Sequence, residues 1–225
     1  MPVLGLSFDD VVTTTRAVRK RLDTTRPVPM SEIMECLEIA LQAPSGGNGQ
    51  GWRWLVVTDE TKKAAIAELY RSAALEMFER QAADTTLSPS TRRAYEGAVH
   101  LAKTLEDVPV LVIPCALGRI DGADNQRSAG FYGSIVPAVW SFQLALRSRG
   151  LGTVYTTAHL KHERELARLL GIPDDVTQVA LLPVAYTRGT DFRPAERHPV
   201  EAVTYVDTWG AGMQDAGVSE GAQQV

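Results

Sequence analysis

Cysteine is scarce in this sequence, with only Cys36 and Cys115 among 225 residues. Their spacing indicates neither a disulfide framework nor a zinc ribbon, so we expect a reducing, cytoplasmic setting. The N-terminus lacks a basic region followed by an apolar core, so no secretory signal is expected. The longest apolar stretch, 108–117, is too short to span a bilayer, so no membrane partner is predicted.

An excess of charge of one sign is also lacking, since 23 Lys and Arg residues stand against 27 Asp and Glu residues. The formal net charge is -4, with 22% charged and 44% hydrophobic residues, which is ordinary for a globular protein and argues against nucleic-acid binding. No G-x-S-x-G elbow occurs, and neither cysteine lies in an activating motif. His159 and His162 could share a helix face and bind a metal, but no further ligands accompany them. A solvated helix face is the preferred interpretation, and no metal site is predicted.

Hydrophobic periodicity predicts one α+β domain over 1–210, followed by a disordered tail over 211–225. We expect the polar segment 118–130 to be a loop and the side chains of Trp52, Trp54 and Trp140 to lie in the core. The expected helices cover 7–21, 31–43, 60–84, 88–105, 133–149 and 161–171, and the expected strands cover 52–58, 108–117, 152–157 and 177–186.

Basic residues cluster at the end of the first predicted helix and again near the C-terminus. In the first cluster, Arg16 and Arg19 are three residues apart, which would place them on one helix face. They could hold a phosphate, with Arg197 closing the same site. The alternative is that these cations only complement the helix dipole and aid solubility.

The segment 43–57, "APSGGNGQGWRWLVV", joins the second predicted helix to the first strand. Pro44 ends the helix, two glycines permit close backbone approach, and Asn48 offers an amide donor and acceptor. A plain turn is the alternative for this loop. The segment 149–157 contains G-L-G but lacks a third glycine and runs from helix to strand, so it is not a dinucleotide fingerprint. Cationic anchors without a protein nucleophile suggest that a bound cofactor performs the chemistry.

Four segments, in order, resemble the FMN-dependent nitroreductase family. The segment 14–29 is similar to its R-S-x-R-type phosphate motif, and 43–57 to its A-P-S-x-x-N-x-Q-P-W loop. The segment 146–157 resembles its G-L-G turn, and 181–199 resembles its closing strand and P-x-x-R-x-P segment. The resemblance covers almost the whole chain.

The resemblance implies a nitroreductase-like α+β fold, with a mixed, mainly antiparallel sheet flanked by helices, in an intertwined homodimer with FMN at the interface. It implies that the phosphate meets Arg16, Arg19 and Arg197, and that a backbone N–H near Thr157 lies against the reactive flavin nitrogen. The loop from Pro44 would reach the flavin of the partner subunit. The full set of cofactor-binding residues implied is Arg16, Ala17, Arg19, Pro44, Ser45, Gly46, Asn48, Ser134, Thr156, Thr157 and Arg197.

The family further implies hydride transfer from NADPH or NADH to FMN, then reduction of a nitroaromatic, quinone or similar small acceptor. The alternatives are an FMN storage or sequestration protein, and reductive dehalogenation or flavin breakdown on the same scaffold. Three departures from the family pattern matter. Ala17 replaces the serine of the R-S pair, and Gly51 replaces the proline of Q-P-W. Tyr155 and Thr157 stand where better-known members have other residues, which bears on the substrate and the reductant.

Overall fold

The computed structural model of the protein describes residues 3–212. Internal contacts divide the chain into two units, Met1–Phe192 and Arg193–Val225. The predicted single domain over 1–210 stays a prediction. From residue 213 onward, the predicted disordered tail lies outside the described residues.

The first unit is built on a five-stranded sheet with the order β1-β2-β5-β3, in which β4 also pairs with β2. All four pairings between named strands are antiparallel, and isolated bridges such as Ala17 with Thr153 add parallel contacts. This confirms the expected α+β class with a mainly antiparallel sheet. The strands are β1 (Trp52–Val57), β2 (Val110–Leu117), β3 (Leu151–Gly152), β4 (Val176–Gln178) and β5 (Leu182–Tyr186).

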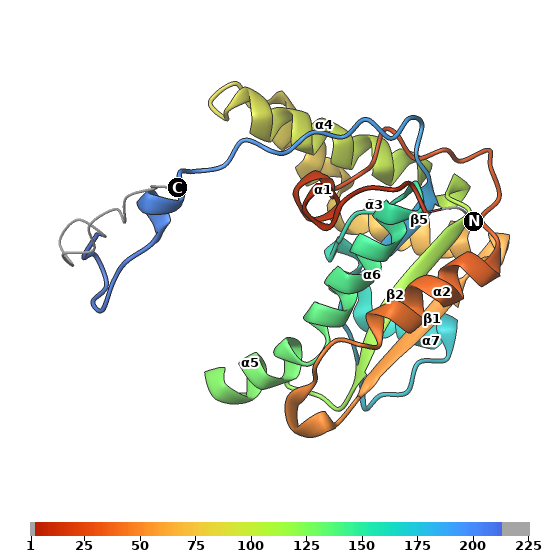
Figure 1. Cartoon of the computed structure of the whole chain (residues 1–225). Helices are drawn as coiled ribbons and strands as arrows, with labels where there is room; N and C mark the ends of the chain where they lie inside the picture. Colours follow the sequence, from red (N-terminus) through yellow and green to blue (C-terminus); the bar gives the residue numbers. More distant parts are fainter. Residues whose placement is uncertain (1–2, 213–225) are drawn as a thin grey trace. The chain divides into compact units, whose positions relative to one another are not determined.

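Helices cover both faces of the sheet (Figure 1). β2 shows why: Val110 and Val112 join the core under α2 and α6, whereas Leu111 and Ile113 join the core under α3 and α4. Successive side chains of a strand point to opposite faces, so an uninterrupted apolar run requires cover on both. The helices are α1 (Phe8–Thr14), α2 (Met30–Ala40), α3 (Glu60–Ala83), α4 (Pro89–Thr104), α5 (Asn125–Gly133), α6 (Val136–Ser148) and α7 (Glu163–Leu170), with short 3-10 turns η1 (Gly46–Asn48), η2 (Leu105–Asp107), η3 (Ala158–His162) and η4 (Val200–Val203).

The first helix ends earlier than predicted. Ser7 caps α1 by accepting from the backbone N–H of Asp10 at 3.1 Å, as its sequence indicated. Beyond Thr14 the chain becomes extended, because the N–H of Val18 donates to the carbonyl of Thr153 at 2.9 Å. The prediction that Arg16 and Arg19 share a helix face is therefore wrong. Pairing with the sheet overrides local helical periodicity here.

The last predicted strand, 177–186, is divided into β4 and β5. Cys115 faces Gln178 and Val112 faces Leu182, so two residues of β2 oppose three residues of the other chain segment. This is a bulge, and it occurs beside Pro114, which has no N–H to give to the ladder. Within the bulge, Leu181 pairs with Thr156 instead. The predicted strand 152–157 is correspondingly reduced to Leu151–Gly152 and isolated bridges.

The segment predicted as a loop, 118–130, contains the start of α5. Asp124 caps this helix by accepting from the N–H of Arg127 at 2.8 Å. The stretch Asn125–Ser148, which spans α5 and α6, is long and apolar enough to cross a membrane by length and composition alone. Its α6 part, however, carries core residues such as Phe142, which is 0% exposed. Trp140 on α6 was expected in the core, but it faces outward and is 43% exposed.

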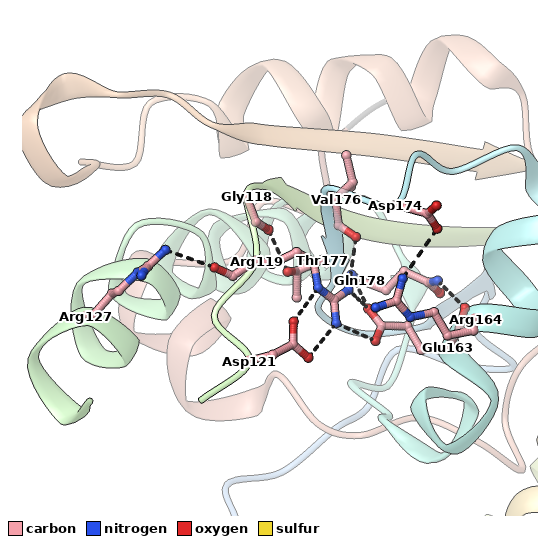
Figure 2. Close-up of polar contacts among 10 residues, drawn as sticks. All are labelled: Gly118, Arg119, Asp121, Arg127, Glu163, Arg164, Asp174, Val176, Thr177 and Gln178. Atoms are coloured by element: carbon pink, nitrogen blue, oxygen red, sulfur yellow. Dashed lines mark hydrogen bonds and ion pairs between the residues drawn. The ribbon is translucent and has the colours of Figure 1, made fainter. Parts of the chain in front are cut away.

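An arginine network fixes the end of β2 to the start of α7 (Figure 2). Arg119 contacts the carboxylates of Asp121 and Glu163, each through a closest N–O distance of 2.7 Å, and donates to the carbonyl of Val176 at 3.2 Å. The two carboxylates raise the pKa of Arg119. Gln178 of β4 donates to the backbone of Glu163 at 2.9 Å. The turn η3, which precedes α7, is thereby held against the sheet.

Candidate flavin site

A pocket of about 380 Å³ opens between α3, α4 and the segment 155–158 that follows β3. We call it the aromatic pocket, because the rings of Tyr70, Phe78 and Tyr95 form a series with centroids 6.3 Å apart along one wall. Its lining residues are Arg19, Tyr70, Ala73, Ala74, Met77, Phe78, Ala94, Tyr95, Ala98, Tyr155, Thr156, Thr157 and Ala158. Small alanines between rings leave a slot suited to a planar ligand.

Thr156 and Thr157, both predicted at the cofactor, form one edge of the aromatic pocket. Thr156 is held on both sides: its hydroxyl lies 2.9 Å from that of Tyr70, and its backbone exchanges two hydrogen bonds with Leu181. Thr157 is exposed, and no backbone hydrogen bond within residues 3–212 uses its N–H. The Thr157 N–H therefore lies at the edge of the pocket on a segment that Thr156 holds in place, and the backbone does not use it.

Arg19 is the cation of the aromatic pocket. Its side chain lies against Gly97 of α4, where an added Cβ would come within 3.3 Å of Arg19 Cδ. Burial lowers the pKa of Arg19, with a smaller opposing effect from Tyr70. Among the described residues, no carboxylate lies within ion-pair distance of it. A partly desolvated cation without an internal counter-charge is costly, and a bound anion would offset that cost.

Arg19 also borders a second pocket of about 210 Å³, which we call the basic pocket. Two of its cations are already engaged, Lys20 with Glu96 at 3.1 Å and Arg21 with Asp191 at 2.5 Å. Its lining residues are Ala17, Val18, Arg19, Lys20, Arg21, Arg93, Gly97 and Phe192. The two pockets meet at Arg19, so an aromatic slot leads to a cationic one.

The glycine-rich loop is locally strained. Gly47, Asn48 and Gln50 have positive φ angles of 57°, 55° and 45°. The Oδ1 of Asn48 accepts from the Gln50 side chain at 2.9 Å, and the Ser45 hydroxyl accepts from the Gln50 N–H at 3.2 Å. Positive φ is uncommon for residues other than glycine and is retained mainly where surroundings enforce it.

This loop docks on Ser134. The N–H of Gly46 donates to the Ser134 hydroxyl at 3.0 Å, and that hydroxyl donates to the carbonyl of Gly130 at 2.7 Å. Pro44, Ser45, Gly46, Asn48 and Ser134 do not line the aromatic or the basic pocket. Figure 1 shows their segment beside α5, away from α4. Within one chain, the predicted cofactor residues therefore fall into two groups. Arg19, Thr156 and Thr157 line the pockets, whereas the residues of the glycine-rich loop and Ser134 lie elsewhere.

Arg197 belongs to the second unit, where its side chain donates to the carbonyl of Glu196 at 3.1 Å. No residue of this unit is buried in its described part, 193–212. Its rings of Tyr205 and Trp209 lie 4.9 Å apart, and Trp209 is 89% exposed. The role of Arg197 stays a prediction.

The histidines form no metal cluster: within residues 3–212, no group of three or more His, Cys, Asp or Glu side chains could hold an ion. His162 meets the Ser72 hydroxyl at 3.1 Å. His159 is 0% exposed, so the preferred interpretation of it as part of a solvated face is wrong. Burial lowers the pKa of His159 to about 4, with a smaller opposing effect from Glu163. Burial also raises the pKa of Cys36 to about 11 and of Cys115 to about 12, so neither thiol ionises readily.

The family model described as "Nitroreductase family" matches residues 12–186. The chain belongs to the nitroreductase family. This confirms the resemblance, and the matched segment contains both the aromatic pocket and the glycine-rich loop.

Relatives within the nitroreductase family carry different names. The chain is 27% identical over 173 residues to an iodotyrosine deiodinase of Thermotoga neapolitana, covering 76% of this chain and 84% of the relative. It is 25% identical over 209 residues to a 5,6-dimethylbenzimidazole synthase of Rhodospirillum rubrum, covering 88% and 89%. A crystal structure of oxidised iodotyrosine deiodinase bound to FMN and 3-iodo-L-tyrosine matches with a TM-score of 0.64 at 26% identity, covering 86% of this chain and 95% of that one.

Sequence reasoning missed several pocket residues of this nitroreductase-family protein. Tyr70 and Phe78 lie on a helix whose apolar positions indicated only core or interface. Arg93 and Gly97 are four residues apart, which places them on one face of α4. That spacing was the available signal, but nothing in the sequence shows that α4 faces the segment with Arg19.

Proposed function

We propose that the protein is an FMN-dependent oxidoreductase that takes hydride from NADPH or NADH and reduces a nitroaromatic, quinone or similar acceptor. The observation that carries this proposal is the junction of the aromatic and basic pockets at Arg19. FMN has a matching division, with a planar ring system at one end and a phosphate at the other. A bound flavin would supply the redox chemistry by accepting hydride and passing electrons on.

The residues of the two pockets suit this cofactor. Arg19, which has no internal counter-charge among the described residues, would meet the phosphate together with Arg93. The N–H of Thr157 would donate to the ring system lying against Tyr70 and Phe78. Few side chains are left for acid–base work, which agrees with chemistry carried by the cofactor.

We also propose a homodimer in which the loop of one chain completes the flavin site of the other. Support comes from the separation of the predicted residues into two groups and from exposed apolar side chains near the loop. These side chains are Met30 and Met34 on α2, Tyr132 on α5, and Val136 and Trp140 on α6, each between 38% and 49% exposed. A row of exposed apolar residues on packed helices is typical of an interface. We place this dimer in the cytoplasm, where buried free thiols such as Cys36 and Cys115 persist.

Reductive dehalogenation is the second candidate function. It is favoured by the identity with iodotyrosine deiodinases, which extends over most of both chains. A halogenated aromatic acceptor would occupy the same part of the aromatic pocket as a nitroaromatic one. The two candidates share the flavin and differ in the acceptor.

The test begins with the visible spectrum of the purified protein and of the protein mixed with FMN. We expect a yellow protein whose flavin absorbance bleaches on rapid mixing with NADPH and returns on addition of a nitroaromatic. Recovery with 3-iodo-L-tyrosine and release of iodide would instead select dehalogenation. Bound flavin that neither NADPH nor NADH reduces would indicate storage, and a colourless protein that refuses FMN would reject both redox functions.

A further inference from the structure

Tyr70 of α3 is a buried residue of the aromatic pocket whose hydroxyl reaches a distant part of the chain. The residue is 1% exposed, and its hydroxyl lies 2.9 Å from the hydroxyl of Thr156, which is 86 residues further along. Burial raises the pKa of Tyr70, with smaller opposing effects from the hydrogen bond with Thr156 and from the charge of Arg19. The phenol therefore keeps its proton at neutral pH, and one hydrogen bond joins the two hydroxyls.

The backbone alone holds Thr156 at a single place. Thr156 forms an isolated bridge with Leu181, through two hydrogen bonds of 3.2 and 2.8 Å, and belongs to no named strand. Leu181 lies in the bulge between β4 and β5, where the ladder with β2 is interrupted. A single bridge beside an interrupted ladder opens more readily than the interior of a regular strand. The hydrogen bond from Tyr70 therefore adds a third point of attachment where the backbone gives little.

The direction of the Thr157 N–H follows from the placement of Thr156. The Thr156 carbonyl and the Thr157 N–H belong to one peptide unit, which is planar and trans, so they point in opposite directions. The carbonyl accepts from the N–H of Leu181 at 2.8 Å, whereas the Thr157 N–H is used by no backbone hydrogen bond within residues 3–212. Whatever fixes Thr156 therefore also fixes the direction of this unused donor at the edge of the aromatic pocket.

We propose that Tyr70 is a positioning residue that, through Thr156, holds the Thr157 N–H in place for the ring system of the flavin. This inference rests on the proposed function and deepens it. Hydride transfer adds electron density to the ring, and a donor that is already fixed stabilises this density without having to reorient. Tyr70 would thereby favour the reduced flavin without taking part in the transfer itself.

Tyr95 on α4 supplies a matched control. It lines the same pocket, and its ring lies 6.3 Å from that of Phe78, as the ring of Tyr70 does. Its hydroxyl forms no hydrogen bond with another residue in the described part of the chain. Tyr70→Phe and Tyr95→Phe therefore each remove one phenolic oxygen from the pocket, but only the first breaks a hydrogen bond. Thr156→Val removes the partner hydroxyl at similar volume.

The first measurement is amide hydrogen exchange of the purified full-length chain, with and without added FMN. In Tyr70→Phe and in Thr156→Val, the N–H of Thr156 should exchange roughly 2- to 10-fold faster in both samples, because one of its attachments is lost. The N–H groups of β2 should keep their rates in these variants. The N–H of Thr156 should keep its rate in Tyr95→Phe.

The second measurement is the two-electron midpoint potential of the bound flavin. It should become more negative in Tyr70→Phe and in Thr156→Val, by a roughly 3- to 10-fold change in the reduction equilibrium, which corresponds to about 15–30 mV. The double variant should show no further shift, because both changes break the same hydrogen bond. Tyr95→Phe should leave the potential unchanged.

Four outcomes would overturn the proposal. Equally faster exchange throughout β2 would show that Tyr70 only supports overall stability. Faster exchange at Thr156 with an unchanged potential would show that this segment positions nothing at the flavin. An equal potential shift in Tyr95→Phe would assign the effect to the polarity of the pocket. An unaltered chain that takes up no FMN would reject the proposed function together with this role, and its absorbance reveals that before any variant is compared.

Discussion

At the scale of single residues, Arg19 is the most informative position, because it is shared by the two pockets. Replacing it with alanine should raise the Kd for FMN by roughly 10- to 150-fold, corresponding to about 1.5–3 kcal/mol for a hydrogen bond to a charged group. Arg16→Ala and Arg197→Ala are predicted to fall in the same range. Fluorescence titration with FMN measures the change.

Riboflavin provides the control ligand for this prediction, since it lacks the phosphate. Arg19→Ala should weaken the binding of riboflavin much less than the binding of FMN. Arg80→Ala, on α3 but outside both pockets, should change neither affinity. Equal losses for the two ligands would show that Arg19 acts on the ring or on folding and not on the phosphate.

His159 should make the protein sensitive to acid. Its folded pKa of about 4 lies below the ordinary value of 6.5, so the unfolded chain binds the extra proton first as the pH falls. Stability is therefore fully present above pH 6.5 and declines between pH 6.5 and 4. The loss at pH 5 should be about 2 kcal/mol. Urea unfolding of the protein and of His159→Phe at pH 7.5 and 5 measures it, and a variant with the same pH dependence would contradict the assignment.

At the scale of elements, β3 depends on a residue without a side chain. A Cβ on Gly152 would lie 2.6 Å from Thr187 Cγ2 and 3.0 Å from Val18 Cβ. Gly152→Ala should therefore destabilise the protein by roughly 1–3 kcal/mol through overpacking. Gly133→Ala, where no atom lies within 4 Å of the added Cβ, is the matched control. Equal unfolding midpoints for the two variants would contradict this account of β3.

Elements with strong local signals were predictable. The caps Ser7 and Ser88 mark true helix starts, and the burial of β2 on both faces follows directly from its apolar run. The prediction failed where long-range pairing overrode a local pattern. Arg16 lies on irregular chain and Arg19 begins a turn, because their segment bridges to Thr153, next to β3. The bulge opposite Pro114 depends on register between distant segments, which no short window of sequence contains.

The candidate site was only half accessible to sequence reasoning. The residues taken from motifs, such as Thr157 and Arg19, do border the aromatic pocket. Tyr70 and Arg93 were missed because their neighbours come from elements far along the chain. Residue type alone also misled: Trp140 faces solvent, and His159 is buried. Burial of such residues depends on packing between elements and not on their own polarity.

At the scale of the whole molecule, the proposed site requires two chains, so flavin binding should be linked to association. FMN should tighten the dimer, and dilution below the dimer dissociation constant should release flavin. Sedimentation velocity with detection at the flavin absorbance measures both quantities. The variant Trp140→Glu, which places a charge on the exposed face of α6, should shift the protein toward monomer and lower its flavin content. A monomer with full flavin content would contradict the shared site.

The separation of Arg19 from the glycine-rich loop also has a genetic consequence. A chain carrying Arg19→Ala and a chain carrying Ser45→Ala with Asn48→Ala would each form homodimers with two defective sites. A mixed dimer would contain one site with both defects and one site built wholly from unaltered residues. Co-expression of the two variants should therefore restore flavin binding at one site in every mixed dimer, so two defective alleles would complement each other.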